Sequence, residues 1–260
     1  MSRGPGYELD EALRRLHLPT VRRLYPGLIT EAEKSSWTYR ELLEQLFSEE
    51  IAHRQETRIQ RASRGAKFPF LKTIEEFDFE FQKSVQRVTL GRYLGPELVS
   101  EGRCAVFQGL PGRGKTHLGI AIAYKAIQNG FSARFTTTAS LLNALHKASL
   151  METLDDTLAE YIEPDVLLID ELGYLAYGPD AANGLFQVID SRYLSQKPVL
   201  ITTNKEVTAK HWGAVLHDTE LAAAIIDRLL ERGEVICLRG KSYRNRKGED
   251  VEVDEDPRRP

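Results

Sequence analysis

Apolar positions follow two different patterns along this chain. Up to residue 67 they recur at helical spacing and predict an all-helical segment, in which Pro26-Gly27 is expected to break the helix. After residue 102, short apolar runs alternate with amphipathic segments. This alternation predicts an α/β fold with a five-stranded parallel sheet. The expected strands are 104–108, 132–137, 166–171, 198–204 and 234–239, and the expected helices between them include 116–128, 138–147, 180–195 and 218–230.

A long helix is predicted to follow Thr38 and to stop near Gly65. Thr38 and Glu41 have the spacing of a capping box, in which each side chain satisfies a backbone N–H of the other. The apolar stripe of this helix comprises Leu42, Leu43, Leu46, Phe47 and Ile51. We therefore expect four parts: a helical N-terminal domain at 1–67, a linker at 68–81, an α/β domain at 82–244, and a disordered acidic tail at 245–260.

One loop carries a phosphate-binding pattern. It lies between the first apolar run and a helical segment, and it matches Gly, four residues, Gly-Lys-Thr. Glycines allow successive backbone N–H groups to form an anion-binding nest at the start of a helix. The lysine is expected to reach the β- and γ-phosphates of ATP, and the threonine hydroxyl to bind Mg²⁺. The predicted nucleotide-binding residues are Gly109, Leu110, Pro111, Gly112, Arg113, Gly114, Lys115, Thr116 and His117.

Three further positions complete a predicted hydrolytic site. The apolar run 166–169 ends in Asp170-Glu171, which matches the Walker B pattern: Asp170 would bind Mg²⁺, and Glu171 would act as general base toward water. Asn204 ends a later strand, where a sensor side chain would orient that water. Arg228 is either a structural partner of Asp227 or Glu231, or an arginine finger for a neighbouring subunit.

The far end of the long helix is basic. Between residues 51 and 72 six basic residues face a single acid, Glu56. Such a run is either a solvated, ion-paired face or a sequence-nonspecific contact with the phosphates of double-stranded DNA. The candidate DNA-binding residues are Arg54, Arg58, Arg61, Arg64 and Lys67.

Composition narrows the setting of the chain. The 260 residues are 42% hydrophobic and 28% charged, with a net charge of −3, so only local charge argues for nucleic acid. No apolar run is long enough for a transmembrane helix, and no signal peptide is recognisable, so we expect a cytoplasmic protein with no membrane partner. Cys104 and Cys237 are expected to be reduced and buried.

Several motifs together resemble those of the IstB-like transposition helper ATPases, AAA+ proteins related to DnaC and DnaA. The resemblance runs from about Leu9 to Arg244. It is carried by Phe-Pro-x-x-Lys-Thr at 68–73, Glu-Phe-Asp-Phe at 76–79, Gly-Lys-Thr-His-Leu at 114–118, Asp-Glu-Leu-Gly-Tyr at 170–174, Leu-Phe-Gln-Val-Ile at 185–189, Trp-Gly at 212–213, Ala-Ile-Ile-Asp-Arg-Leu at 224–229 and Gly-x-Ser-Tyr-Arg at 240–244.

The resemblance implies an ATP-driven homo-oligomer that assembles on DNA, remodels it, and recruits or stimulates a transposase. It favours an arginine finger at Arg228. Arg113 departs from the family pattern, which has a small residue there, and too few residues follow Arg228 for a C-terminal helical lid.

Three alternatives remain open. A replicative helicase loader would share the whole ATPase core. A small-molecule P-loop kinase does not account for Asp170-Glu171, Asn204 and Arg228 together, and a scaffold that binds ATP without turnover does not account for Glu171. The aromatic linker is either simply packed or forms a wall of the adenine pocket.

Overall fold

The computed structural model describes residues 5–174 and 181–244, so the predicted acidic tail lies outside the described residues. The chain divides into two compact units, residues 1–61 and 62–260, which are treated separately below. None of the described helices combines the length and apolar character that crossing a membrane requires.

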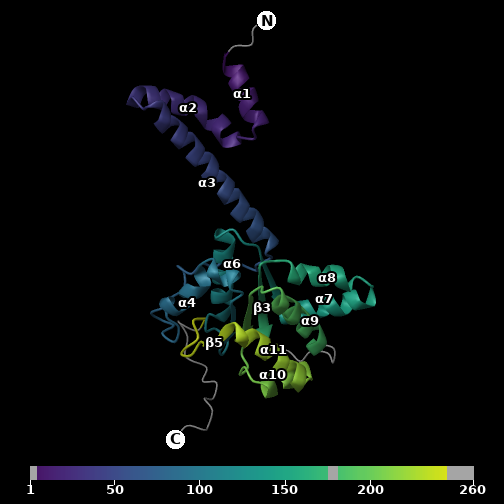
Figure 1. The fold of residues 1–260 in the computed structure, drawn as a ribbon. Coiled ribbons are helices and arrows are strands. Elements are labelled where there is room, and N and C mark those ends of the chain that lie inside the picture. Colours follow the sequence, from purple (N-terminus) through teal and green to yellow (C-terminus); the bar gives the residue numbers. More distant parts are fainter. Residues whose placement is uncertain (1–4, 175–180, 245–260) are drawn as a thin grey trace. The chain divides into compact units, whose positions relative to one another are not determined.

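The first unit is helical, as the periodicity predicts. It contains α1 (Pro5–Arg15), α2 (Pro19–Ser35) and most of α3 (Tyr39–Gly65) (Figure 1). Its small core consists of Leu13, Val21 and Leu46, one from each helix. Each helix is therefore held by one apolar stripe against the other two.

The predicted break at Pro26-Gly27 is wrong, because α2 runs through Pro26 without interruption. Proline costs an interior helix one hydrogen bond and introduces a steric clash. Here Leu24, Tyr25 and Leu28 pack on the core, so tertiary contacts hold the helix on both sides of the proline. The Thr30 hydroxyl also donates to the Pro26 carbonyl at 3.2 Å.

The predicted start of α3 is confirmed in atomic detail. Thr38 N donates to Glu41 Oε2 at 2.7 Å, and Glu41 N donates to Thr38 Oγ1 at 3.3 Å. The predicted apolar stripe, by contrast, is only partly buried. Leu46 is buried, whereas Leu43, Phe47 and Ile51 are 51%, 47% and 64% exposed.

The second unit confirms the predicted fold class, an α/β domain with a five-stranded parallel sheet. Its strand order is β2-β3-β4-β1-β5, and each paired strand is parallel. The elements are α4 (Arg87–Leu94), α5 (Glu97–Ser100), β1 (Cys104–Gln108), α6 (Lys115–Gln128), β2 (Ala133–Thr137), α7 (Thr138–Leu150), α8 (Leu154–Ile162), β3 (Val166–Leu172), α9 (Ala181–Leu194), β4 (Val199–Thr203), α10 (Ala209–Leu216), α11 (Thr219–Glu231) and β5 (Gly233–Cys237).

Helices cover both faces of this sheet (Figure 1). One face packs against α7, α9, α10 and α11 in a core that includes Val106, Ile169 and Ile201. The other face packs against α6, where Gly119 leaves room for the Leu168 side chain. The inner strand β3 is consequently buried up to Asp170, and the exposed Glu171 follows at the edge where the β1–α6 loop also lies.

Helix α10 has no counterpart among the predicted elements. It is eight residues long, begins with Thr208 accepting a hydrogen bond from His211 N, and buries Trp212 completely. Among residues 238–244, which follow β5, the structure contains no helix. Cys104 is buried and Cys237 is half-buried, and neither is in a disulfide.

Candidate functional site

The phosphate-binding loop joins β1 to α6, as the pattern predicts. Gly112 has φ +77° and Gly114 has φ +92°, a region that side chains disfavour. A Cβ on Gly112 would lie 2.0 Å from Ser242 Oγ, and one on Gly114 would lie 2.7 Å from the Phe77 ring. Two distant segments, the linker and the chain following β5, therefore pack against the loop only because it has no side chains there.

These segments enclose a pocket of about 290 Å³ over the loop. The loop residues from Pro111 to His117 line it together with Glu171. The linker contributes Phe70, Phe77 and Phe81, and the last described residues contribute Tyr243 and Arg244. Tyr243 N donates to Gly112 O at 2.9 Å, and the Phe81 and Tyr243 rings meet edge to face at 5.4 Å. The pocket thus combines a cationic floor with aromatic walls.

Lys115 lies almost buried on the pocket floor. Its Nζ donates to Leu110 O at 2.9 Å and to Tyr174 Oη at 3.3 Å. Burial lowers the pKa of Lys115 to about 8, although the negative charge of the Asp170 carboxylate acts to raise this pKa. The negative charge of a bound phosphate would compensate for the water that the Lys115 ammonium group loses on burial. An anionic ligand in this pocket would therefore favour the charged form of Lys115.

The predicted magnesium-binding residues lie together. Thr116 Oγ1 donates to both Asp170 oxygens, at 2.9 and 3.1 Å, and Asp170 is 5% exposed. Hydroxyl and carboxylate oxygens are the ligands that Mg²⁺ prefers. The donor set therefore fits this ion.

Thr202 on β4 is a functional candidate that sequence inspection missed. Its hydroxyl donates to Asp170 Oδ1 and accepts a hydrogen bond from Glu171 N at 3.0 Å. Glu171 has φ +63°, at an irregularity in the β3–β4 pairing. Thr202 therefore positions both predicted carboxylates, and the only signal in the sequence is its place near the end of a strand next to β3.

Asn204, the predicted sensor, lies beside the segment that follows β3. Its Oδ1 is 3.4 Å from where a Cβ on Gly173 would lie. This oxygen is buried and accepts no hydrogen bond from the described residues. A buried acceptor without a protein donor suits a water molecule.

Arg228 is not among the described residues that line the pocket. It lies on α11, where its Nε donates to Asp190 Oδ1 at 2.5 Å and its guanidinium stacks over the Phe186 ring at 4.7 Å. Asp190, rather than Asp227 or Glu231, is thus its partner within the chain. The structure does not bring Arg228 together with Lys115 in one subunit.

Two other residues of the loop have distinct surroundings. Arg113 lines the pocket, and its Nε is buried with no hydrogen-bond partner among the described residues. His117 Nε2 lies 2.9 Å from Thr73 O, and its ring meets Phe77 edge to face at 5.2 Å. Burial lowers the pKa of His117, so the neutral ring that donates to Thr73 is favoured.

The candidate DNA-binding residues are divided between the two units. Arg54, Arg58 and Arg61 belong to the first unit, whereas Arg64 and Lys67 belong to the second. Arg54 pairs with Glu50 at 2.8 Å, and Lys67 lies 4.0 Å from Glu160. Arg54 is therefore ion-paired within the first unit and Lys67 within the second.

The fold is shared with several solved structures. DnaI aligns with a TM-score of 0.54 at 20% identity, over 65% of this chain and 91% of its own. The DnaC helicase loader aligns with a TM-score of 0.51 at 22% identity, over 58% of this chain and 87% of its own. At these identities the similarity concerns the fold.

Sequence comparison identifies the family. An ATP-binding protein of insertion sequence IS5376 from Geobacillus stearothermophilus is 37% identical over 92% of this chain and 94% of its own length. One of insertion sequence IS21 from Pseudomonas aeruginosa is 32% identical over 92% and 89%. The family described as IstB-like ATP binding protein matches residues 11–250. The chain therefore belongs to the IstB-like ATP binding proteins and has the P-loop ATPase fold of the AAA+ superfamily.

Proposed function

We propose that this ATPase assembles as a homo-oligomer on double-stranded DNA and recruits or stimulates the transposase of an insertion sequence. One observation carries the proposal. The pocket over the phosphate-binding loop is lined by Lys115, Thr116 and Glu171, and Asp170 is bonded to Thr116. Arg228, also predicted to be catalytic, does not line this pocket and pairs with Asp190.

Each pocket residue has a distinct task in ATP hydrolysis. Lys115 binds the β- and γ-phosphates, and Arg113 and Arg244 add positive charge to the same pocket. A magnesium ion held by Thr116 and Asp170 would neutralise developing phosphate charge. Glu171 accepts a proton from the attacking water.

Asn204 orients that water through its unpartnered Oδ1. The flat, aromatic linker walls suit the adenine ring.

Arg228 acts from a neighbouring subunit. In the isolated chain its positive charge is neutralised by Asp190. Assembly would direct it to the γ-phosphate bound by the next subunit, where an arginine finger contributes about 10³-fold or more in rate. Hydrolysis then depends on assembly, and assembly depends on DNA.

The role in transposition rests on the relatives. The two relatives compared above are ATP-binding proteins of insertion sequences, and each aligns over more than nine-tenths of this chain. A family member that aligns over 94% and 89% of their own lengths fits the same role. DNA contact by the first unit and by Arg64 and Lys67 is sequence-nonspecific, because phosphates carry no direct base information.

Wild type and Glu171→Gln test the proposal together. With ATP and duplexes of unrelated sequence, wild type should assemble and hydrolyse, and the variant should assemble, hydrolyse on the order of 100-fold more slowly, and remain bound. Near-normal hydrolysis by the variant would exclude Glu171 as the base. DNA-dependent assembly would be excluded if the wild-type chain stays monomeric with ATP and duplex. The protein would instead be a helicase loader if a pull-down recovers replicative helicase in place of the transposase.

A further inference from the structure

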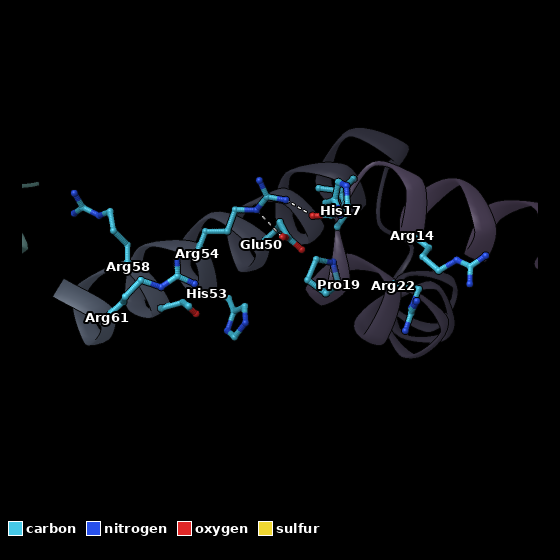
Figure 2. A pocket seen from close by; sticks show the side chains of 11 residues that line it. Arg14, His17, Pro19, Arg22, Glu50, His53, Arg54, Arg58 and Arg61 are labelled. Carbon is cyan, nitrogen blue, oxygen red and sulfur yellow. Dashed lines mark hydrogen bonds and ion pairs between the residues drawn. The ribbon is translucent and has the colours of Figure 1, made fainter. Parts of the chain in front are cut away.

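An open cleft of about 620 Å³ crosses the first unit (Figure 2). All three helices line it. The side chains that line it include five arginines and one carboxylate, Glu50. We call it the basic cleft, and its arginines are Arg14, Arg22, Arg54, Arg58 and Arg61.

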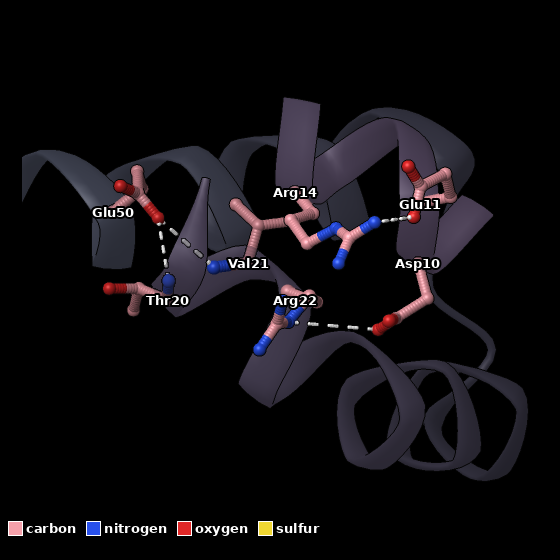
Figure 3. A network of polar contacts seen from close by, with 7 residues as sticks. All are labelled: Asp10, Glu11, Arg14, Thr20, Val21, Arg22 and Glu50. Atoms are coloured by element: carbon pink, nitrogen blue, oxygen red, sulfur yellow. Dashed lines mark hydrogen bonds and ion pairs between the residues drawn. The ribbon is translucent and has the colours of Figure 1, made fainter. Parts of the chain in front are cut away.

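Glu50 is fully engaged inside the unit, and its charge offsets that of Arg54, which leaves four other arginines in the lining. It is 3% exposed and accepts hydrogen bonds from Thr20 N at 2.8 Å and Val21 N at 3.1 Å (Figure 3). It also pairs with Arg54, whose guanidinium donates to His17 O. Burial raises the pKa of Glu50, but these hydrogen bonds together outweigh burial and hold the pKa below its ordinary value.

This arrangement fixes the geometry of the cleft. Glu50 occupies the first N–H groups of α2, so the helix N-terminus is not available to bind another anion. Together with Arg54 it ties the α1–α2 turn and the start of α2 to α3. Glu50 and Arg54 are therefore positioning residues, and the outer arginines are the groups that can meet a ligand.

The outer arginines lie at the two ends of the cleft. Figure 2 shows Arg58 and Arg61 at one end and Arg14 and Arg22 at the other, with Glu50 between them. Arg14 pairs with Glu11, and Arg22 lies 3.8 Å from Asp10. Both pairs are largely exposed, and such pairs contribute only about 0–1 kcal/mol, so phosphate oxygens can replace these carboxylates.

We propose that the basic cleft binds the phosphodiester backbone of double-stranded DNA, with Arg14 and Arg22 as contacts in addition to Arg58 and Arg61. This rests on the proposed assembly on DNA and assigns part of that contact to α1 and α2. No phenylalanine, tyrosine or tryptophan is among the described residues lining the cleft. Single-strand sites use such rings to stack bases, whereas a duplex presents mainly phosphates to nonspecific proteins.

The chain offers matched controls for a test. Arg15 and Arg23 follow Arg14 and Arg22 directly, are exposed, and are not among the lining residues. Arg14→Ala/Arg22→Ala and Arg15→Ala/Arg23→Ala therefore remove the same charge from the same two helices. Affinity for a 30-base-pair duplex is measured by fluorescence anisotropy between about 50 and 300 mM salt, with ATP analogue, and compared with a single strand.

The cleft variant should lose about tenfold or more in duplex affinity. The slope of its log affinity against log salt concentration should become less negative by about 1.8, which corresponds to the loss of two phosphate contacts. The control variant should keep a near wild-type slope. Arg14→Lys/Arg22→Lys should regain most of the affinity, which excludes misfolding as the cause of the loss.

Equal losses in the cleft and control variants would overturn the cleft as the contact while leaving assembly on DNA intact. A wild-type chain without salt-dependent duplex binding would overturn both. Tighter binding of the single strand, lost in the cleft variant, would overturn the assignment to a duplex.

Discussion

Thr202→Val is the sharpest perturbation that the structure suggests, because it keeps the shape of the side chain and removes one hydroxyl. Thr202 is 1% exposed, and its hydroxyl connects Asp170 Oδ1 with Glu171 N. Its loss removes a hydrogen bond to a carboxylate and leaves a backbone N–H without its partner. The first is worth about 1.5–3 kcal/mol, and the second costs about 1–3 kcal/mol.

The backbone of Glu171 makes the effect on catalysis specific. A glutamate at φ +63° is strained by roughly 1–3 kcal/mol and persists only when its surroundings hold it there. Without the Thr202 bond, Glu171 can relax away from the water it activates. If 1.5–3 kcal/mol of transition-state stabilisation is lost, kcat falls by about 10- to 150-fold.

Thr203→Val is the matched control. The Thr203 hydroxyl is also buried and also makes two bonds, to Leu172 O at 2.8 Å and from Lys205 N at 3.0 Å, but it touches neither carboxylate. The steady-state kcat for ATP hydrolysis, measured at saturating ATP and duplex, should fall in Thr202→Val, recover in Thr202→Ser, and stay within about threefold of wild type in Thr203→Val. ATP affinity should change little. Equal rates in the two valine variants would refute a positioning role for Thr202.

Two other predictions concern Arg228 and Glu50. Arg228→Ala should abolish most ATPase activity, and mixing it with a Lys115→Ala chain that keeps its own Arg228 should restore part of it; no recovery at any ratio would argue against a finger between subunits. Glu50→Gln should lower the melting temperature at pH 7. Because the folded pKa of Glu50 is depressed, its ionised form contributes stability above about pH 4.5 that disappears as the pH falls through the folded value, so the gap between variant and wild type should close in acid. A gap that is the same at pH 7 and pH 3 would show that the charge of Glu50 is not what stabilises the unit.

Features that depend only on neighbouring residues could be predicted from the sequence. Three such features are each contiguous in the chain: the phosphate-binding loop, the capping box of α3, and the apolar strand ending at Asp170-Glu171. Each can be recognised from the spacing of a few nearby residues. The alternation of strands and helices likewise fixed the parallel sheet. The resemblance to the IstB-like family was also recognised from these local motifs.

Which distant segments meet could be learned only from the three-dimensional packing. Thr202 reaches Asp170 because β4 pairs with β3, and Tyr243 reaches the loop because the chain after β5 folds back over Gly112. Helix α2 continues through Pro26 because flanking residues pack on other helices. Periodicity shows that a helix has an apolar face, but only the packing of remote segments decides whether that face is covered and which side chains share a site. For the same reason Arg14 and Arg22 became candidates only when three helices placed them across one cleft from Arg58 and Arg61.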